Sequence, residues 1–571
     1  MDPWEEVRAS DERPGARGGG PAGRDPRDPE RGPGRLSTPV AGVGGRVQDA
    51  RMLLADVAAT SSALGATRSR LAKRALLVDL LRRTPPADVP IVARYLAGEL
   101  RQRRTGLGWR SLRTMPPPAD EPSLQVADVD AAFARMAGLA GPGSGTARAA
   151  EAAALFGAAT APEQDFLGRL VSGEVRQGAL DALLLDAVAE AAGVPPESVR
   201  RAAMLAGATE PVAQAALAAT DPSAAREALA AFTLEVGRPV RPMLAQSAPD
   251  VAAALTTVAD VEDGDLAVVD AKLDGIRVQV HRADDEVAVF TRSLDDITAR
   301  VPEIVEQVRA LPAHRLVLDG EALVVDGTGR PVPFQDTAAR AASGDAEVAA
   351  TQLLQPFFFD CLHLDGEDLL DRPLTERLAA LDRLLVDRPG LGVARVVTAD
   401  PETALEHARA VLAAGHEGVV VKAAGSSYEA GRRGAAWVKV KPRHTLDLVV
   451  LAVERGSGRR QGLLSNIHLG ARDEHGGFVM LGKTFKGMTD EMLAWQTERF
   501  RELEMADDGW VVTVRPEQVV EIAFDGVQRS TRYPGGLALR FARVLRYRDD
   551  KSAAEADTIT RVRELAAWAE G

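Results

Sequence analysis

The sequence contains one cysteine, Cys361, among 571 residues. A single thiol excludes an internal disulfide framework and any zinc site built from several cysteines. Cys361 lies in an apolar run with three phenylalanines before it. We therefore expect it to be a buried small side chain and not a reactive thiol.

Long apolar runs are also missing. No stretch approaches the roughly 20 uninterrupted apolar residues that span a bilayer. No apolar core follows the charged N-terminal residues, as it would in a signal peptide. We expect a cytoplasmic protein without membrane association.

The sequence lacks an excess of positive charge, because its formal net charge is -13. Taken alone, this value argues against nucleic acid as a partner, since phosphate binding needs lysine and arginine. The distribution of charge matters more in a chain with several domains. Basic residues outnumber acidic ones in 94–113, 425–460 and 529–551. These three clusters favour a polyanionic partner.

The length predicts three or four domains at about 150 residues each. Residues 1–45 are rich in Gly, Pro, Arg and Asp with few large apolar residues, which is typical of a disordered tail. Residues 46–235 are rich in Ala and Leu at helical spacing, as in Leu180, Leu183 and Leu184, and predict an all-helical domain.

Period-two stretches at 266–272, 276–281 and 287–292 predict antiparallel strands, and helices are expected near 300–310 and 373–386. Residues 236–443 therefore read as an α+β domain. Residues 444–571 combine short strands, glycine-rich turns and one helix around 490–505, which suits a small β-barrel. The expected fold is thus a multidomain one: all-α, then α+β, then a barrel.

The arginines of the helical domain gather in one glycine-containing loop. Such a loop lets backbone and guanidinium groups approach phosphates together. We expect DNA contacts from Arg101, Arg103, Arg104 and Arg110.

In the α+β domain, Lys272 is followed by Asp274 and Gly275. A desolvated lysine beside other cations can act as a nucleophile, although this short pattern is common by chance. An ordered set of charged and aromatic residues follows it: Arg277, Arg292, Glu321, Phe359, Glu417, Lys439 and Lys441. Together they provide cations for a triphosphate, carboxylates for a metal and an aromatic face for a base. Nucleotidyl transfer needs this inventory, because it relies on positioning and charge stabilisation.

The order and spacing of these residues resemble the covalent nucleotidyltransferase superfamily of DNA ligases, RNA ligases and messenger-RNA capping enzymes. The resemblance is strongest to ATP-dependent DNA ligases of the stand-alone bacterial type with an N-terminal helical DNA-binding domain. It covers roughly residues 46–571.

The resemblance implies a role for each residue. Lys272 would attack the α-phosphate of ATP and carry AMP as a phosphoramidate, and Phe359 would stack on adenine. The remaining nucleotide contacts would come from Asp270 at the adenine amino group, Arg277 and Arg292 at ribose and phosphate, Glu321 at ribose or metal, and Arg433, Lys439 and Lys441 at the phosphates. Glu321 and Glu417 would bind Mg²⁺ with retained waters.

Some assignments stay open at this point. Phe357 shares a face with Phe359, so either ring could stack, and Arg432 competes with Arg433. Many family members have Glu where this chain has Asp270, and Pro where it has Ala542. The resemblance implies that residues 539–551, on an OB-fold barrel, close over ATP in the first step.

The resemblance further implies a monomer that encircles nicked duplex DNA near the nucleoid and acts in replication, recombination and repair of DNA damage. One cysteine argues against an NAD-dependent ligase, since these carry a four-cysteine zinc site. An RNA ligase or capping enzyme, and a non-catalytic DNA-binding clamp with the same fold, remain as alternatives. The sequence does not distinguish a main replicative ligase from an accessory repair enzyme.

Overall fold

A computed structural model describes residues 51–102, 105–112, 115–175, 177, 180–258, 265–343, 352–430, 436–457 and 460–566. These residues belong to one compact unit, Arg51–Gly571. The predicted tail at 1–45 lies outside them, as do Arg103, Arg104, Arg432 and Arg433. None of the described helices is both long and apolar enough to span a membrane.

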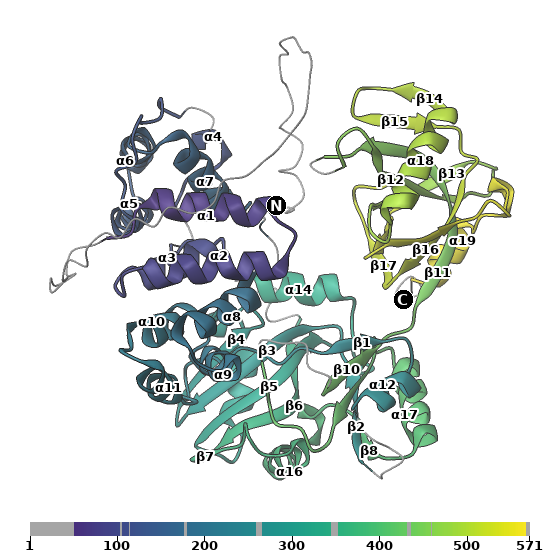
Figure 1. Cartoon of the computed structure of the whole chain (residues 1–571). Coiled ribbons are helices and arrows are strands. Elements are labelled where there is room, and N and C mark those ends of the chain that lie inside the picture. The colour runs from purple at the N-terminus through teal and green to yellow at the C-terminus, as the bar shows by residue number, and fades with distance from the viewer. Residues whose placement is uncertain are drawn as a thin grey trace, which may run out of the picture. The chain divides into compact units, whose positions relative to one another are not determined.

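The N-terminal region is helical, as predicted (Figure 1). Two of its helix ends show caps that the sequence supplies. Thr160 and Glu163 form a capping box at the start of α7, and Gly207 ends α9 with a φ of 70°. The helices share one apolar core. They are α1 (Leu54–Ala66), α2 (Arg70–Arg83), α3 (Val89–Leu96), α4 (Trp109–Leu112), α5 (Val126–Gly138), α6 (Ser144–Gly157), α7 (Ala161–Ser172), α8 (Leu180–Ala192), α9 (Pro196–Ala206), α10 (Glu210–Ala218) and α11 (Pro222–Ala230).

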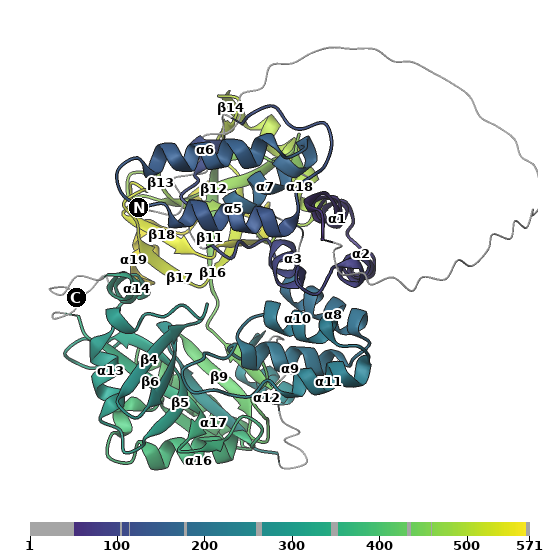
Figure 2. The same ribbon diagram turned by 90° about the vertical axis from the view of Figure 1, so that its left-hand side faces the viewer.

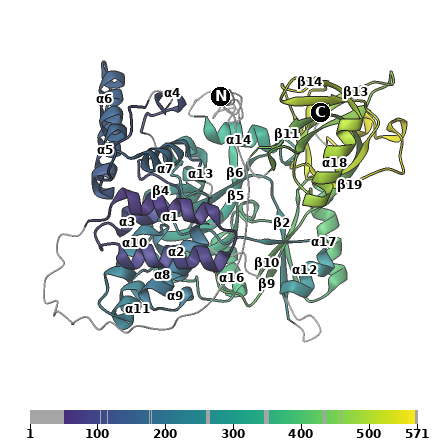
Figure 3. The same ribbon diagram turned by 45° about the horizontal axis from the view of Figure 1, so that its top comes forward.

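The middle region holds two five-stranded sheets. The first sheet has the order β1-β10-β9-β2-β8, and α12 and α17 pack on one of its faces (Figure 3). Its elements are β1 (Gln246–Ala248), α12 (Val251–Val258), β2 (Ala267–Lys272), β8 (Arg395–Thr398), α17 (Pro401–Ala413), β9 (Gly418–Ala423) and β10 (Trp437–Val440).

The second sheet has the order β4-β3-β5-β6-β7, and α13 and α16 contribute to its core. Its elements are β3 (Ile276–Ala283), β4 (Glu286–Thr291), α13 (Pro302–Arg309), β5 (Arg315–Val324), α14 (Phe334–Ala342), β6 (Leu354–Leu364), β7 (Glu367–Asp368) and α16 (Leu374–Leu384). The predicted strands and helices of this region are confirmed to within three residues.

The C-terminal region is rich in strands around a core that α18 (Asp490–Glu502) and α19 (Ile559–Glu564) complete. A seven-stranded sheet contains β11 (His444–Arg455), β12 (Leu464–Arg472), β13 (Phe478–Thr484), β14 (Glu504–Asp507), β15 (Val511–Val514), β16 (Val519–Phe524) and β19 (Arg543–Tyr547).

The predicted barrel is not confirmed by the strand pairing. Strands β17 (Gly526–Arg529) and β18 (Leu537–Arg540) form a separate ladder, so the two edges of the large sheet do not meet among the described residues. Along the long strand β11, residues 444–449 pair with β16 and residues 452–454 pair with β15, while β12 pairs with residues 449–455.

Candidate nucleotide site

Lys272 is the last residue of β2, and strand alternation sets the direction of its side chain. Val269 and Ala271 pack into the core beneath α12 and α17. Asp270 and Lys272 therefore project from the opposite face of the first sheet. Trp437 lies opposite Lys422 in the register of β10 and β9, and the pairs Asp270–Val420 and Lys272–Gly418 continue this face.

The Glu417 carboxylate lies between two ammonium groups. One oxygen accepts a hydrogen bond from Lys272 and the other from Lys441. The side chains of Lys272, Lys441 and Glu417 are 20%, 24% and 14% exposed. Although burial opposes its charge, the two lysines hold the pKa of Glu417 below its usual value. The nucleophile candidate is thus fixed in place yet reachable from solvent.

Close backbone approach supports this cluster at Gly418. Its φ is 148°, and a Cβ there would lie 2.2 Å from the Val440 carbonyl oxygen. Only glycine fits this position, which brings Glu417 and Lys441 together at the ends of neighbouring strands.

Glu321 projects from β5 of the second sheet and accepts a hydrogen bond from the Gly275 N–H at 3.2 Å. Burial raises the pKa of Glu321 to about 7, and the charges of Lys272 and Arg277 oppose the rise. The carboxyl is therefore near Lys272 and Arg277, and burial outweighs the effect of their charges on its pKa. A Cβ on Gly275 would lie 2.5 Å from the Ala322 carbonyl oxygen, so this turn also requires glycine.

Arg277 lies opposite Glu321 in the register of β3 and β5. Its guanidinium donates to both oxygens of Asp319 at 3.0 and 2.6 Å, and to the Met243 carbonyl at 2.6 Å. Although burial opposes its charge, Asp319 holds the pKa of Arg277 above its usual value. The Tyr428 hydroxyl donates to Asp319 at 2.6 Å. Tyr428 was missed from the sequence, where it stands alone in a small-residue segment.

Phe359 and Trp437 meet edge to face with ring centroids 5.9 Å apart. The Lys422 ammonium lies 4.5 and 4.1 Å from these two centroids and 2.5 Å from Asp270. Asp270 and Lys422 are each 2% exposed. Asp270 therefore has a buried cationic partner that the sequence did not predict.

The three phenylalanines of this run divide between two cores. Phe358 is fully buried in the core of the second sheet, whereas Phe357 and Phe359 both pack against the core beneath α12 and α17. Phe359 also contacts the cluster of Trp437 and Tyr428.

The remaining predicted residues are dispersed. Lys439 is half-buried on β10, on the same side as Trp437. Arg292 is exposed in the turn after β4, and the described residues show no contact between it and the Lys272 cluster. Arg433 and its alternative Arg432 lie outside the described residues.

From the C-terminal region, Arg540 donates to Asp274 at 2.6 Å, and Asp525 lies 3.6 Å from Lys441. The segment expected to close over ATP thus contacts the Lys272 turn.

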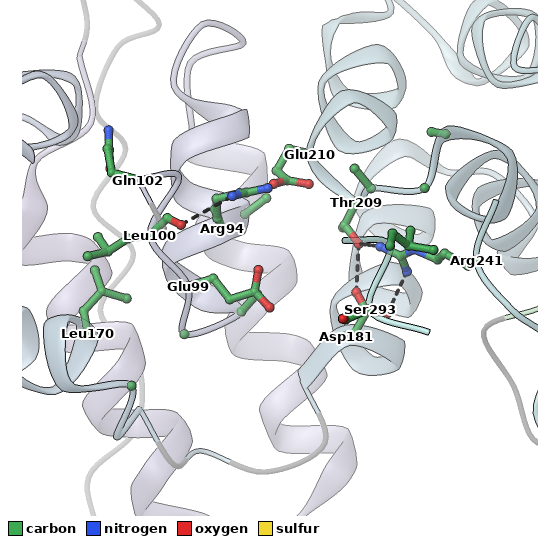
Figure 4. A pocket seen from close by; sticks show the side chains of 18 of the residues that line it. Arg94, Glu99, Leu100, Gln102, Leu170, Asp181, Thr209, Glu210, Arg241 and Ser293 are labelled. Carbon is green, nitrogen blue, oxygen red and sulfur yellow. Dashed lines mark hydrogen bonds and ion pairs between the residues drawn. The ribbon is translucent and has the colours of Figure 1, made fainter. Parts of the chain in front are cut away.

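The described residues Gln102, Thr105, Gly106 and Leu107 of the predicted arginine loop line a different pocket, of about 990 Å³ (Figure 4). Leu100, Gln102 and Thr105 line one side. On another side, Arg241 donates to Asp181 at 2.7 Å. Arg101 is ion-paired with Asp130, and Arg110 lies on α4. This pocket is lined by residues other than those of the Lys272 cluster.

The carboxylates of this site supply some, but not all, of the ligands that a metal ion needs. Glu321 and Glu417 are two carboxylates near one another, since the charge of Glu417 adds to the rise in the pKa of Glu321 that burial causes. Among the described residues, no three His, Cys, Asp or Glu side chains gather into a complete metal site. Two carboxylates suit Mg²⁺, which keeps several waters and binds substrate phosphates.

Comparisons with known proteins agree with this geometry. Residues 242–441 match the family model described as ATP dependent DNA ligase domain, and residues 460–551 match ATP dependent DNA ligase C terminal region. The chain is 73% identical over 516 residues to a probable DNA ligase of Beutenbergia cavernae, which covers 90% of this chain and 100% of that protein. A probable DNA ligase of Kineococcus radiotolerans is 64% identical, with the same two coverages. The solved structure of Pmar-Lig_PreS3 has a TM-score of 0.57 and 18% identity, covering 86% of this chain and 99% of its own, which indicates a shared fold.

Proposed function

This chain belongs to the family of ATP-dependent DNA ligases, and we propose that Lys272 is the nucleophile that carries AMP. The observation that carries the proposal is the position of the Lys272 ammonium. It is held by Glu417, beside Lys441 and Glu321, on the face of the sheet that also presents Asp270 and Trp437.

In the first step, Lys272 Nζ gives up a proton to solvent and forms a bond to the α-phosphorus of ATP. The bond between that phosphorus and the bridging oxygen breaks, and pyrophosphate leaves. Glu417 keeps Nζ at the point of attack, so little freedom is lost on reaction. Lys441, Lys439 and Arg433 would bind the phosphates, and Arg540 would orient pyrophosphate as the C-terminal region closes.

The base and ribose would lie between the two sheets. Phe359 offers an aromatic face, and the buried pair of Asp270 and Lys422 offers one acceptor and one donor beside it. Arg277 and Glu321 would contact the ribose or phosphate. Arg292 would need a change in its exposed turn to reach them.

Mg²⁺ is the metal that Glu321 and Glu417 fit best, and its chemistry there would be to neutralise phosphate charge. A cation bound beside Glu321 would favour the charged form of this carboxyl, which burial disfavours.

The DNA steps follow from the family. AMP passes from Lys272 to the 5′-phosphate at a nick, and the lysine leaves with its proton restored. The 3′-hydroxyl then attacks that phosphate, AMP leaves, and the strand is sealed.

We infer that a monomer encircles the duplex with three domains: 46–235, 236–443 and an OB-fold barrel at 444–571. Contacts from Arg101, Arg103, Arg104 and Arg110 would be to phosphates, since nicks occur in any sequence. Roles in DNA replication, recombination and repair are consistent with this activity.

Labelling with α-³²P-ATP and Mg²⁺ in the absence of DNA tests the nucleophile. The wild-type chain should acquire label, and peptide mass spectrometry should find one AMP on Lys272. Lys272→Ala should acquire none while binding nicked DNA normally. Lys483→Ala is the matched control, because Lys483 is also a half-buried lysine paired with a glutamate but lies in the C-terminal region. Label on Lys272→Ala would refute the assignment.

A substrate panel separates the alternatives. A ligase for DNA should seal a nicked all-DNA duplex faster than a nicked all-RNA duplex. Preference for RNA would favour an RNA ligase or capping enzyme. A wild-type chain that binds DNA but acquires no label would be a non-catalytic clamp.

A further inference from the structure

Tyr428 links three elements of the nucleotide site through one hydroxyl group. The hydroxyl donates to Asp319 at 2.6 Å, accepts from the Met243 N–H at 3.1 Å and lies 3.4 Å from an Arg277 nitrogen. The tyrosine is fully buried, and its ring lies edge to face with Trp437, with centroids 6.1 Å apart. The positions of Arg277 and Trp437 therefore depend on where Tyr428 and Met243 are held.

The end of helix α9, in the helical region, holds both of these residues. The Met204 carbonyl accepts a hydrogen bond from the Arg241 N–H at 3.0 Å, two residues before Met243. The Met204 sulfur accepts from the Ala430 N–H at 3.2 Å, two residues after Tyr428. One methionine thus contacts the chain on both sides of the Tyr428 hydroxyl network.

The helix can approach this closely because Gly207 follows it. Gly207 has a φ of 70°, and a Cβ there would lie 2.6 Å from the Pro239 carbonyl oxygen. No other residue type fits both the conformation and the contact. The helix end is therefore fixed against the segment that leads to Met243.

The side chains here form a single apolar cluster. Met204 and Leu205 are 3% and 2% exposed and pack with Met243, Tyr428 and Trp437. Phe359 packs against the same cluster. The same cluster contains Val317 of β5 and Leu362 of β6, and Figure 1 shows α9 next to the strands of the second sheet. Figure 2 shows α9 grouped with α8, α10 and α11. A flexible thioether fills such an irregular space well.

We propose that Met204 is a positioning residue of the nucleotide site, so that the helical region takes part in the reaction with ATP as well as in DNA binding. The inference rests on the proposed function of Arg277, Phe359 and Lys272. Met204 touches none of the reacting atoms. It acts by setting Tyr428, Trp437 and Arg277, and hence the fit of base and ribose.

The test measures the rate constant of DNA-free adenylylation of the full chain at varied ATP concentration. Because each chain takes up AMP once, KM here is the ATP concentration at half the limiting rate constant, and kcat is that limiting rate constant. Met204→Ala should raise the KM for ATP by about three- to tenfold, less than the roughly 100-fold cost of a 1 Å misplacement at a reacting group. Its kcat should change less than twofold, because Lys272 is held by Glu417 and not by the cluster that contains Met204. Met204→Leu conserves most of the volume and should restore the KM to near the wild-type value.

Val199→Ala provides the matched control. Val199 is on the same helix and fully buried, but it packs into the core of the helical region. This variant should lower the thermal midpoint without raising the KM for ATP. Nicked-DNA affinity should stay within twofold of wild type for Met204→Ala.

The outcomes are distinct. A folded Met204→Ala with a wild-type KM for ATP would overturn the positioning role. An equal rise in KM for Val199→Ala would show that general destabilisation of the helical region causes the rise. That result would also overturn the positioning role of Met204. A wild-type chain that never forms the AMP adduct would instead contradict the proposed function.

Discussion

Replacing Arg377 with methionine should destabilise the middle region by about 3–5 kcal/mol, the usual cost of leaving one partner of a buried ion pair alone. Arg377 and Asp360 are both fully buried, and the guanidinium donates to the carboxylate at 2.7 and 3.0 Å. It also donates to the carbonyls of Arg372 and Ser426 at 2.7 and 2.8 Å. In the variant, the Cys361 N–H at 3.0 Å is the one donor that the described residues leave to the Asp360 carboxylate.

A second variant separates the two parts of this loss of stability, the unpaired charge of Asp360 and the unsatisfied carbonyls. Asp360→Asn combined with Arg377→Met removes both charges, leaving the two carbonyls without donors and the amide N–H groups of the new asparagine without acceptors. Each unsatisfied carbonyl costs about 1–3 kcal/mol. The double variant should therefore be more stable than Arg377→Met alone, although it carries one more substitution.

Urea denaturation followed by circular dichroism measures these differences, with the slope m compared between variants. Because Asp360 follows Phe359, we also expect weaker ATP binding for Arg377→Met at urea concentrations where it is still folded. A loss below about 1 kcal/mol for the single variant, or a double variant no more stable than the single one, would refute the reasoning.

Three further predictions concern DNA, pH and metal. Replacing Arg101, Arg103 and Arg104 with alanine should weaken binding of nicked DNA and reduce the slope of log affinity against log salt by up to about 0.9 per lost phosphate contact; an unchanged slope would place the loop away from DNA. Burial lowers the pKa of His281 to about 3, so only the unfolded chain binds its proton between about pH 6.5 and 3. Stability should therefore fall as the pH drops through this window, by at most about 1.4 kcal/mol per pH unit, and His281→Gln should show a shallower fall in acid denaturation. Chelation with EDTA should abolish AMP labelling of the protein, and added Mg²⁺ should restore it; labelling that persists in EDTA would contradict the metal assignment.

Strand alternation was enough to predict part of the site. A period of two places Asp270 and Lys272 on one face of β2, and the structure has them there. The helices near 300–310 and 373–386 were also predictable, since each has a regular apolar stripe against the second sheet.

The partners of these residues could not be predicted locally. Lys422 reaches Asp270 from 152 positions away, and Tyr428 reaches Asp319 from 109. Strand register decides both contacts, and a sequence pattern does not specify which strands pair. The barrel prediction was not confirmed for the same reason. Closing a sheet into a barrel depends on pairing between its two edge strands, and short alternating segments do not specify that pairing.

The solitary thiol has a practical consequence for spectroscopy. Cys361 is fully buried, and burial raises its pKa to about 12, so almost no thiolate is present at neutral pH. Maleimide dyes need an accessible thiolate and should leave the native chain unlabelled. Cysteines introduced at exposed positions such as Leu71 and Met505 would then be the only reactive ones. Distance changes between the helical and C-terminal regions during the reaction could be followed by fluorescence energy transfer without altering the native sequence elsewhere.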